Sequence, residues 1–126
     1  LRIKESLGND SEVVVVSMGP ERVQKVIREA LSKGADRGIY INEIPEINSD
    51  PFATAKVFAN VIKDENFDLI FSGLQSDDVG SGQTGVILGE MLGMATATLV
   101  MATEVQEGSI KVKRELESGW FQWVSM

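Results

Sequence analysis

The chain has 126 residues and a formal net charge of −7, and it contains neither cysteine nor histidine. The acidic balance argues against nucleic acids and anionic membranes as electrostatic partners, because binding to such polyanions depends on counterion release by basic side chains. The missing residue types exclude disulfides, thiol nucleophiles, the common zinc sites and the usual general base, so unaided hydrolytic catalysis is not expected.

Residues 1–41 predict a helix, a strand, a second helix and a second strand. The segment Leu1–Leu7 has the pattern of a helix tail, which Gly8 ends. A β-branched run over residues 12–16 predicts a strand buried on both faces, followed by a turn at residues 17–19. Pro20 and the acidic residue after it suit a first helical turn, and an apolar stripe continues to Gly34. A short strand is then expected over residues 37–41.

Residues 50–126 predict two more helices and further strands. Asp50 and Pro51 are the residue types of a helix cap and a first helical position. The buried face of that helix is expected to consist largely of Phe52, Ala55, Val57, Phe58, Val61 and Ile62. Next we expect a strand over 68–71 that stops at Ser72, and then a helix that ends near Gly93. Strands over 98–106 and 109–116 are joined by a hairpin turn at 107–108, and residues 119–126 are again strand-like.

Strands that alternate with helices predict an α/β fold with an open, mostly parallel sheet, flanking helices and right-handed crossovers. An antiparallel hairpin is expected near the C-terminus. The length suits one core, so we expect a single α/β nucleotide-binding domain over residues 1–126. Because Leu1 is not an initiator methionine, the chain is interpreted as a fragment of a longer subunit. No apolar run approaches the ~20 residues that a membrane helix needs, and a soluble intracellular protein is expected.

The candidate binding site lies between residues 67 and 93, where a strand, a polar glycine-bearing loop and a helix start follow one another. In open α/β sheets this arrangement places backbone N–H groups and the positive end of a helix beside a phosphate. The loop contains no lysine or arginine, so an anion would rest on main-chain amides and on the Thr84 hydroxyl. The candidate cofactor-binding residues of this stretch are Leu74, Gln75, Ser76, Asp77, Asp78, Val79, Gly80, Ser81, Gly82, Gln83, Thr84 and Gly85.

Other interpretations of these residues stay open on the pattern alone. Asp77 and Asp78 would repel a neighbouring phosphate, so they suit ribose hydroxyls better, or they cap the turn. An ordinary solvated loop is the competing interpretation, because loops rich in Asp, Ser and Gly are common. Met18 follows another strand and would pack on a base if the two strands were neighbours. The alternative for Met18 is a buried residue that fills a gap in the core.

Four segments together resemble the β subunit of electron transfer flavoprotein. They are Val13–Pro20, Ala30–Gly38, Asp68–Asp78 and Gly82–Gly85, and the resemblance covers nearly the whole chain. It implies an adenine-nucleotide α-hydrolase-like fold. It also implies a heterodimer with an α subunit that makes most contacts to a redox-active FAD, while this subunit binds a structural AMP.

The resemblance assigns roles to individual residues. The family's AMP loop matches Leu74–Gly85, with the phosphate near the backbone of Gln83, Thr84 and Gly85, and Met18 falls against the nucleotide. The threonine that follows Gln83 resembles the sequence of the family's AMP-binding branch. The electron-bifurcating branch holds a second FAD where the other branch holds AMP.

As a whole, the resemblance implies an electron carrier subunit and not an enzyme. Acyl-CoA or other flavin dehydrogenases would supply the electrons, and a quinone-linked oxidoreductase would accept them. The expected location is the cytoplasm of a prokaryote or the mitochondrial matrix of a eukaryote. The alternative is a stress-protein-like or adenylating ATP-binding protein of the same fold, in which Asp77 and Asp78 could hold a metal.

Two groups near the C-terminus carry no motif. Trp120, Phe121 and Trp123 are interpreted as core or interface residues. The basic group Lys111, Lys113 and Arg114 is interpreted as a solvated strand face.

Overall fold

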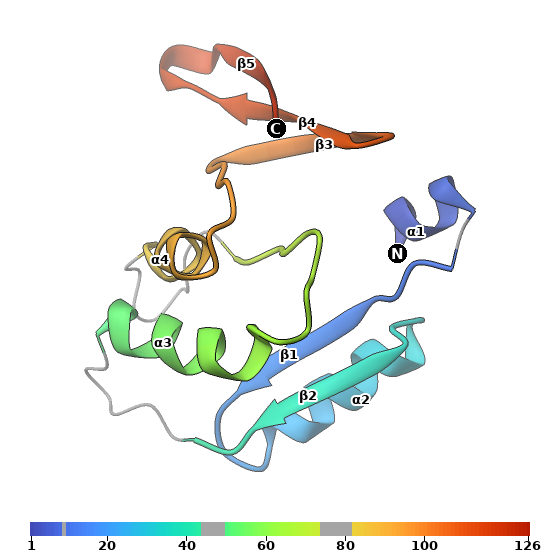
Figure 1. Cartoon of the computed structure of the whole chain (residues 1–126), viewed down its shortest axis with the longest axis vertical. Helices are drawn as coiled ribbons and strands as arrows, with labels where there is room; N and C mark the ends of the chain where they lie inside the picture. Colours follow the sequence, from blue (N-terminus) through green and yellow to red (C-terminus); the bar gives the residue numbers. More distant parts are fainter. Residues whose placement is uncertain (9, 44–49, 74–81) are drawn as a thin grey trace. The chain divides into compact units, whose positions relative to one another are not determined.

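The computed structural model describes residues 1–8, 10–43, 50–73 and 82–126. It divides into two compact units, Leu1–Asn48 and Ser49–Met126, each described below by itself. A small parallel sheet, helices and an antiparallel sheet of three strands confirm the predicted α/β class (Figure 1). The single domain over residues 1–126 stays a prediction.

The first unit contains the elements α1 (Arg2–Leu7), β1 (Val14–Met18), α2 (Val23–Ser32) and β2 (Arg37–Ile41). The strands β1 and β2 pair in parallel, in a register that runs from Val14 opposite Arg37 to Met18 opposite Ile41. Helix α2 connects them and contacts both strands. Helix α2 lies directly against β2 at Gly38, where an added Cβ would overlap the Ile27 side chain. The predicted bounds of β2 and the helix end at Gly8 are confirmed.

Two predicted boundaries in the first unit are wrong by a few residues. Strand β1 covers Val14–Met18, so Ser17 and Met18 belong to the strand and not to the turn. The pairing with β2 continues as far as the amide of Gly19, which donates to the Ile41 carbonyl at 3.1 Å. Helix α2 begins at Val23, and Pro20 lies in a turn before it. The Pro20 carbonyl accepts from the Val23 amide at 2.9 Å. Such i→i+3 bonds commonly precede a regular helix.

Asp36 ties the N-terminal helix to the strands. Its two carboxylate oxygens each accept from the Lys4 ammonium at 2.7 Å, and Oδ2 also accepts from the Val13 amide at 2.8 Å. The Asp36 amide in turn donates to the Val13 carbonyl. The Lys4 hydrogen bond, followed by that of Val13, holds the pKa of Asp36 below its usual value. Asp36 therefore connects three segments that are distant in sequence.

The second unit contains α3 (Pro51–Ile62), α4 (Thr84–Met91), β3 (Val100–Gln106), β4 (Ser109–Glu115), a short 3₁₀ turn at Glu117–Gly119 and β5 (Phe121–Ser125). The predicted cap is confirmed, because the Asp50 carboxylate accepts from the Phe52 amide at 3.0 Å. Helices α3 and α4 pack on each other (Figure 1).

The buried face of α3 is narrower than predicted. Ala55, Ala59 and Ile62 are buried, whereas Phe52 and Val61 are 53% and 38% exposed. Two alanines one turn apart allow a close approach of the neighbouring helix, so the contact covers a thin stripe and not the flanking side chains. The prediction that Phe52 and Val61 are buried is therefore wrong.

The predicted strand over Asp68–Phe71 is also wrong. This segment has no strand hydrogen bonds in the described part of the second unit, and Leu69 and Phe71 are 39% and 66% exposed. An apolar run becomes a strand only when a neighbour takes its backbone hydrogen bonds. The described strands β3, β4 and β5 pair with one another and not with this segment.

The antiparallel sheet has β4 in its centre, and the predicted hairpin turn is confirmed by the pairing of Gln106 with Ser109. A bulge interrupts the ladder between Val100 and Ala102. Arg114 fixes the entry to β3, because its guanidinium donates to the carbonyl and the hydroxyl of Thr98 at 2.9 and 3.0 Å. Arg114 is therefore not part of the same solvated face as Lys111 and Lys113, which corrects the grouping made from sequence.

Candidate functional site

The candidate site is the start of helix α4. Residues Leu74–Ser81 of the predicted loop lie outside the described residues, and Gly82 is the first described residue after them. Gly82 has φ of 62°, a left-handed conformation that suits glycine. Gln83 is the N-cap residue and the helix begins at Thr84, so the predicted helix start is confirmed.

The first turn of α4 has the chemistry of an anion site. It contains no acidic residue, and the Gln83 side chain does not cap it. The amide of Ile87 donates to the Gln83 carbonyl at 3.1 Å, so the amides of Thr84, Gly85 and Val86 precede the regular helix ladder. Such amides, together with the positive end of the helix dipole, favour a phosphate oxygen. The backbone amides predicted to hold an anion therefore lie at a real helix N-terminus.

In the sequence, Ser72 is only the residue at which the predicted strand stops. An added Cβ on Gly85 would overlap the Ser72 hydroxyl and lie 3.2 Å from the Ser72 Cβ. Glycine at position 85 thus allows the segment ending at Ser72 to lie directly against the first turn of α4. The signal in the sequence that could have singled out Ser72 was its position. Ser72 is the first polar residue after an apolar run, and ligand sites in α/β folds lie where such runs end.

Met18 lies in the first unit, as the last residue of β1, and is half-buried opposite Ile41. Gly19 after it is held on both sides: its amide donates to Ile41, and its carbonyl accepts from the Tyr40 hydroxyl at 3.0 Å. These bonds fix the direction in which the chain leaves β1. Gly82–Gly85 belong to the second unit, so the predicted meeting of Met18 with this loop stays a prediction.

The described residues contain neither a candidate metal cluster nor a helix that could span a membrane. Over residues 1–8, 10–43, 50–73 and 82–126, no three or more acidic side chains gather where they could hold a metal ion. Asp77 and Asp78 lie outside that part of the chain. None of the described helices has both the length and the apolar character needed to cross a membrane.

Comparison with known proteins decides the family. The model of the electron transfer flavoprotein domain matches residues 1–124 of this chain. The chain belongs to the electron transfer flavoprotein family. The resemblance noted from sequence is thereby confirmed over almost its full extent.

Relatives in the electron transfer flavoprotein family are named as β subunits. The chain is 38% identical to electron transfer flavoprotein subunit beta of Methylophilus methylotrophus, over all of this chain and 48% of the relative. It is 42% identical to that subunit of Bradyrhizobium diazoefficiens over 94% of this chain and 47% of the relative. The mouse subunit is 36% identical over 86% of this chain and 43% of the relative. The chain thus spans about half the length of these relatives.

Proposed function

We propose that this chain is part of the β subunit of an electron transfer flavoprotein. In this proposal it pairs with an α subunit that makes most contacts to FAD, and it binds AMP itself. Electrons would pass from acyl-CoA or other flavin dehydrogenases to a quinone-linked oxidoreductase. The family match and the names of the relatives support the subunit identity.

The start of α4 is the observation that supports nucleotide binding most directly. Its first turn offers main-chain amides, itself contains no acidic residue and is not capped by the Gln83 side chain, and the Thr84 hydroxyl adds a donor. A nucleoside monophosphate carries one phosphate group, and amides at a helix end suffice to bind such a group. A triphosphate undergoing turnover needs cations or Mg²⁺ near its phosphates. The absence of lysine and arginine between residues 74 and 93 therefore favours AMP over ATP turnover.

The residues at this site suit a structural ligand and electron transfer, not bond-making chemistry. FAD, when bound in the complex, supplies the redox chemistry, and the role of this chain is to support its environment. The chain lacks the histidine and cysteine on which acid–base and thiol catalysis most often depend. We infer that α4 and the segment ending at Ser72 brace the fold around the adenylate.

The test is nucleotide analysis of the full-length protein, purified with its partner subunit. Heat-released supernatant is expected to contain AMP in a ratio near one per complex. Thr84→Val removes the hydroxyl at constant shape and should lower AMP retention, whereas Thr84→Ser should keep it. Thr98→Val is the matched control, because Thr98 bonds to Arg114 and lies outside this site.

Three outcomes would contradict the proposal. FAD in a ratio of two per complex would place this chain in the bifurcating branch and not the AMP branch. A supernatant without nucleotide would remove the ligand altogether. Mg²⁺-dependent ATP hydrolysis by the purified protein would favour the stress-protein-like or adenylating alternative.

A further inference from the structure

Met101 on β3 is the most exposed methionine of the chain. The sequence contains five methionines, and all of them lie among the described residues. Met101 is 60% exposed, whereas Val112 of the same sheet, which pairs with Val124, is only 4% exposed. The remaining methionines are half-buried, and they are Met18, Met91, Met94 and Met126. The five thioethers therefore differ in how readily a small molecule dissolved in water can reach them.

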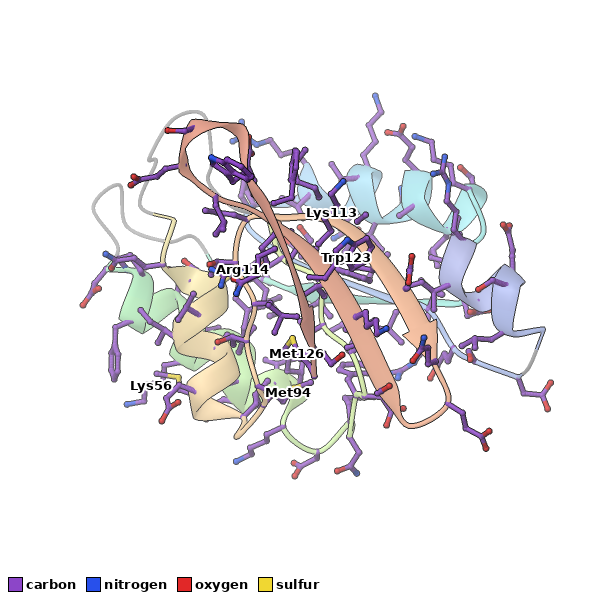
Figure 2. The ribbon with its side chains drawn as sticks, turned by 90° about the horizontal axis from the view of Figure 1, so that it is seen from above. Lys56, Met94, Lys113, Arg114, Trp123 and Met126 are labelled. Carbon is purple, nitrogen blue, oxygen red and sulfur yellow. The ribbon has the colours of Figure 1, made fainter. Side chains whose placement is uncertain are left out.

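A β-bulge sets Met101 apart from the ladder of the sheet. In the register, Val100 lies opposite Arg114 on β4. Ala102 lies opposite Lys113, the direct neighbour of Arg114 (Figure 2). Met101 is therefore the residue that the bulge inserts, and β3 is an edge strand of the sheet. No residue of β4 lies directly opposite Met101, so no cross-strand pair covers its side chain.

An exposed thioether reacts with hydrogen peroxide without help from other side chains. A lone pair of the Met101 Sδ attacks one oxygen of the peroxide, so that an S–O bond forms and the O–O bond breaks. The departing hydroxide takes the proton of the transferred oxygen and leaves as water. Sulfur loses two electrons and the peroxide gains them, and the products are methionine sulfoxide and water.

The cost of the sulfoxide to the fold differs between positions. Oxidation converts an apolar side chain into a polar one. At Met101 the new oxygen stays in water, and the residue takes part in no cross-strand pair. Met94 lines a hollow together with Ile62 and Leu92, where the same oxygen would face apolar side chains. A polar group that loses its water without gaining a hydrogen bond lowers stability.

We propose that Met101 is a site of reversible oxidation by hydrogen peroxide, and that its oxidation leaves the fold intact. Peroxide oxidises Met101 first, and the four half-buried methionines react more slowly. Methionine sulfoxide reductases restore the thioether, with two thiols as the reductant and a disulfide and water as the other products. The inference concerns the sheet of β3, β4 and β5 alone and holds whether or not the start of α4 binds AMP.

The experiment exposes the full-length protein, purified with its partner subunit, to hydrogen peroxide. Mass spectrometry of the peptides follows each methionine separately, in the folded protein and in concentrated urea, where all five thioethers are in solvent. Met101 is expected to react in the folded protein within about threefold of its rate in urea, and the other four to be slowed about tenfold or more. Methionine sulfoxide reductase with dithiothreitol should then remove the oxygen from Met101.

Hydrogen peroxide is the suitable oxidant because exposed indoles lie in the same part of the chain. Trp120 and Trp123 are 72% and 48% exposed, so the interpretation of these two residues as core residues is wrong. Hydroxyl radicals attack indoles and thioethers alike, whereas peroxide under mild conditions oxidises thioethers much faster. The reaction with peroxide therefore reports the methionines.

Matched variants test whether the oxidation is tolerated. Met101→Gln, which places a polar side chain of similar length at this position, is expected to leave the midpoint of urea unfolding unchanged. Met94→Gln is the matched variant at a half-buried position and should lower that midpoint. Met101→Leu should remove the fast-reacting site and leave the rates of the other four methionines unchanged.

Three results would overturn the proposal. Protection of Met101 in the complex to the same degree as the other four would show that another part of the protein covers it. A half-buried methionine that reacts as fast as Met101 would remove the selectivity. A lower urea midpoint for Met101→Gln, or for protein oxidised only at Met101, would show that the oxidation damages the fold.

Discussion

Substituting Gly85 by alanine tests whether the helix start of the candidate site really lies against Ser72. The new methyl group would overlap the Ser72 hydroxyl and lie 3.2 Å from the Ser72 Cβ. Overpacking of this kind costs about 1–3 kcal/mol, toward the lower end where an exposed side chain can rotate away. Alanine in a helix recovers up to about 1 kcal/mol relative to glycine. The net change in the free energy of unfolding is therefore expected to be a loss of about 0–2 kcal/mol.

The second substitution, Ser72→Ala, separates the two contributions. It removes the hydroxyl that causes the overlap, so Gly85→Ala should become neutral, or stabilising by up to about 1 kcal/mol, in that background. The coupling energy of the double-mutant cycle is then about 1–2 kcal/mol, well above the roughly 0.5 kcal/mol by which independent sites deviate from additivity. Urea unfolding of the full-length protein measures all four variants. Equal effects of Gly85→Ala in both backgrounds would refute the contact.

The same variant links the contact to nucleotide binding. Gly85→Ala should lower AMP retention, because it displaces the amides of the first turn. Gly89→Ala is the matched control, since its Cβ would overlap the Thr96 side chain further along the same helix. Gly89→Ala is expected to reduce stability by a similar amount while AMP retention stays unchanged. Loss of AMP in both variants would show that only helix stability matters.

Three further predictions concern the rest of the structure. Lys4→Met should destabilise the protein at neutral pH, because Lys4 lowers the pKa of Asp36 in the folded state. The stabilising effect of the Asp36 carboxylate is present at pH values above its pKa in the unfolded chain. It disappears as the pH falls through its pKa in the folded chain. Urea unfolding between neutral and acidic pH measures the difference in stability between Lys4→Met and the unsubstituted protein. A loss of stability that persists at acidic pH would contradict the prediction. Glu29→Gln is the control, because it breaks only an exposed ion pair within one helix. Gly38→Ala should cost about 1–3 kcal/mol by overlap with Ile27, and Ile27→Ala should relieve that overlap; thermal unfolding of both variants and the double variant decides the point. Asp50→Ala should cost about 0.5–2 kcal/mol through loss of the bond to the Phe52 amide, whereas Asp50→Asn, which retains an acceptor, should cost less.

Local signals in the sequence were sufficient where one residue type dictates one conformation. Asp50 and Pro51 predicted the start of α3, and the turn at residues 107–108 predicted the β3–β4 hairpin. These features depend on neighbours in the chain, which the sequence displays directly.

Predictions failed where the outcome depends on distant residues. The Asp68–Phe71 run has strand-forming residues but no described partner in its unit, and a strand cannot form alone. The end of β1 was misplaced because β2 extends the pairing to Met18. Periodicity predicted that Phe52 would be buried, although the contact with α4 is narrow. In each case the outcome depended on residues distant in sequence and not on the local pattern.

The candidate site was predictable in part for the same reason. The helix start at Thr84 and the left-handed Gly82 follow from local composition. The contact between Gly85 and Ser72 brings together residues on opposite sides of the loop, and no periodicity reports such an approach. Besides the position of Ser72 after an apolar run, Gly85 gave a hint, since close approach of two segments is one of the few reasons for a residue to have no side chain.

The two hydrogen bonds from Arg114 to Thr98 limit how the length of the segment that follows Thr98 can vary. The Leu99 carbonyl accepts from the Glu115 amide at 2.9 Å, and Leu99 itself has φ of 56°, so the chain enters β3 at one fixed step of the ladder. A slip of a single residue would turn the valines outward and the tryptophan inward. The number of residues that separates Thr98 from Trp123 is therefore constrained by the register of the sheet.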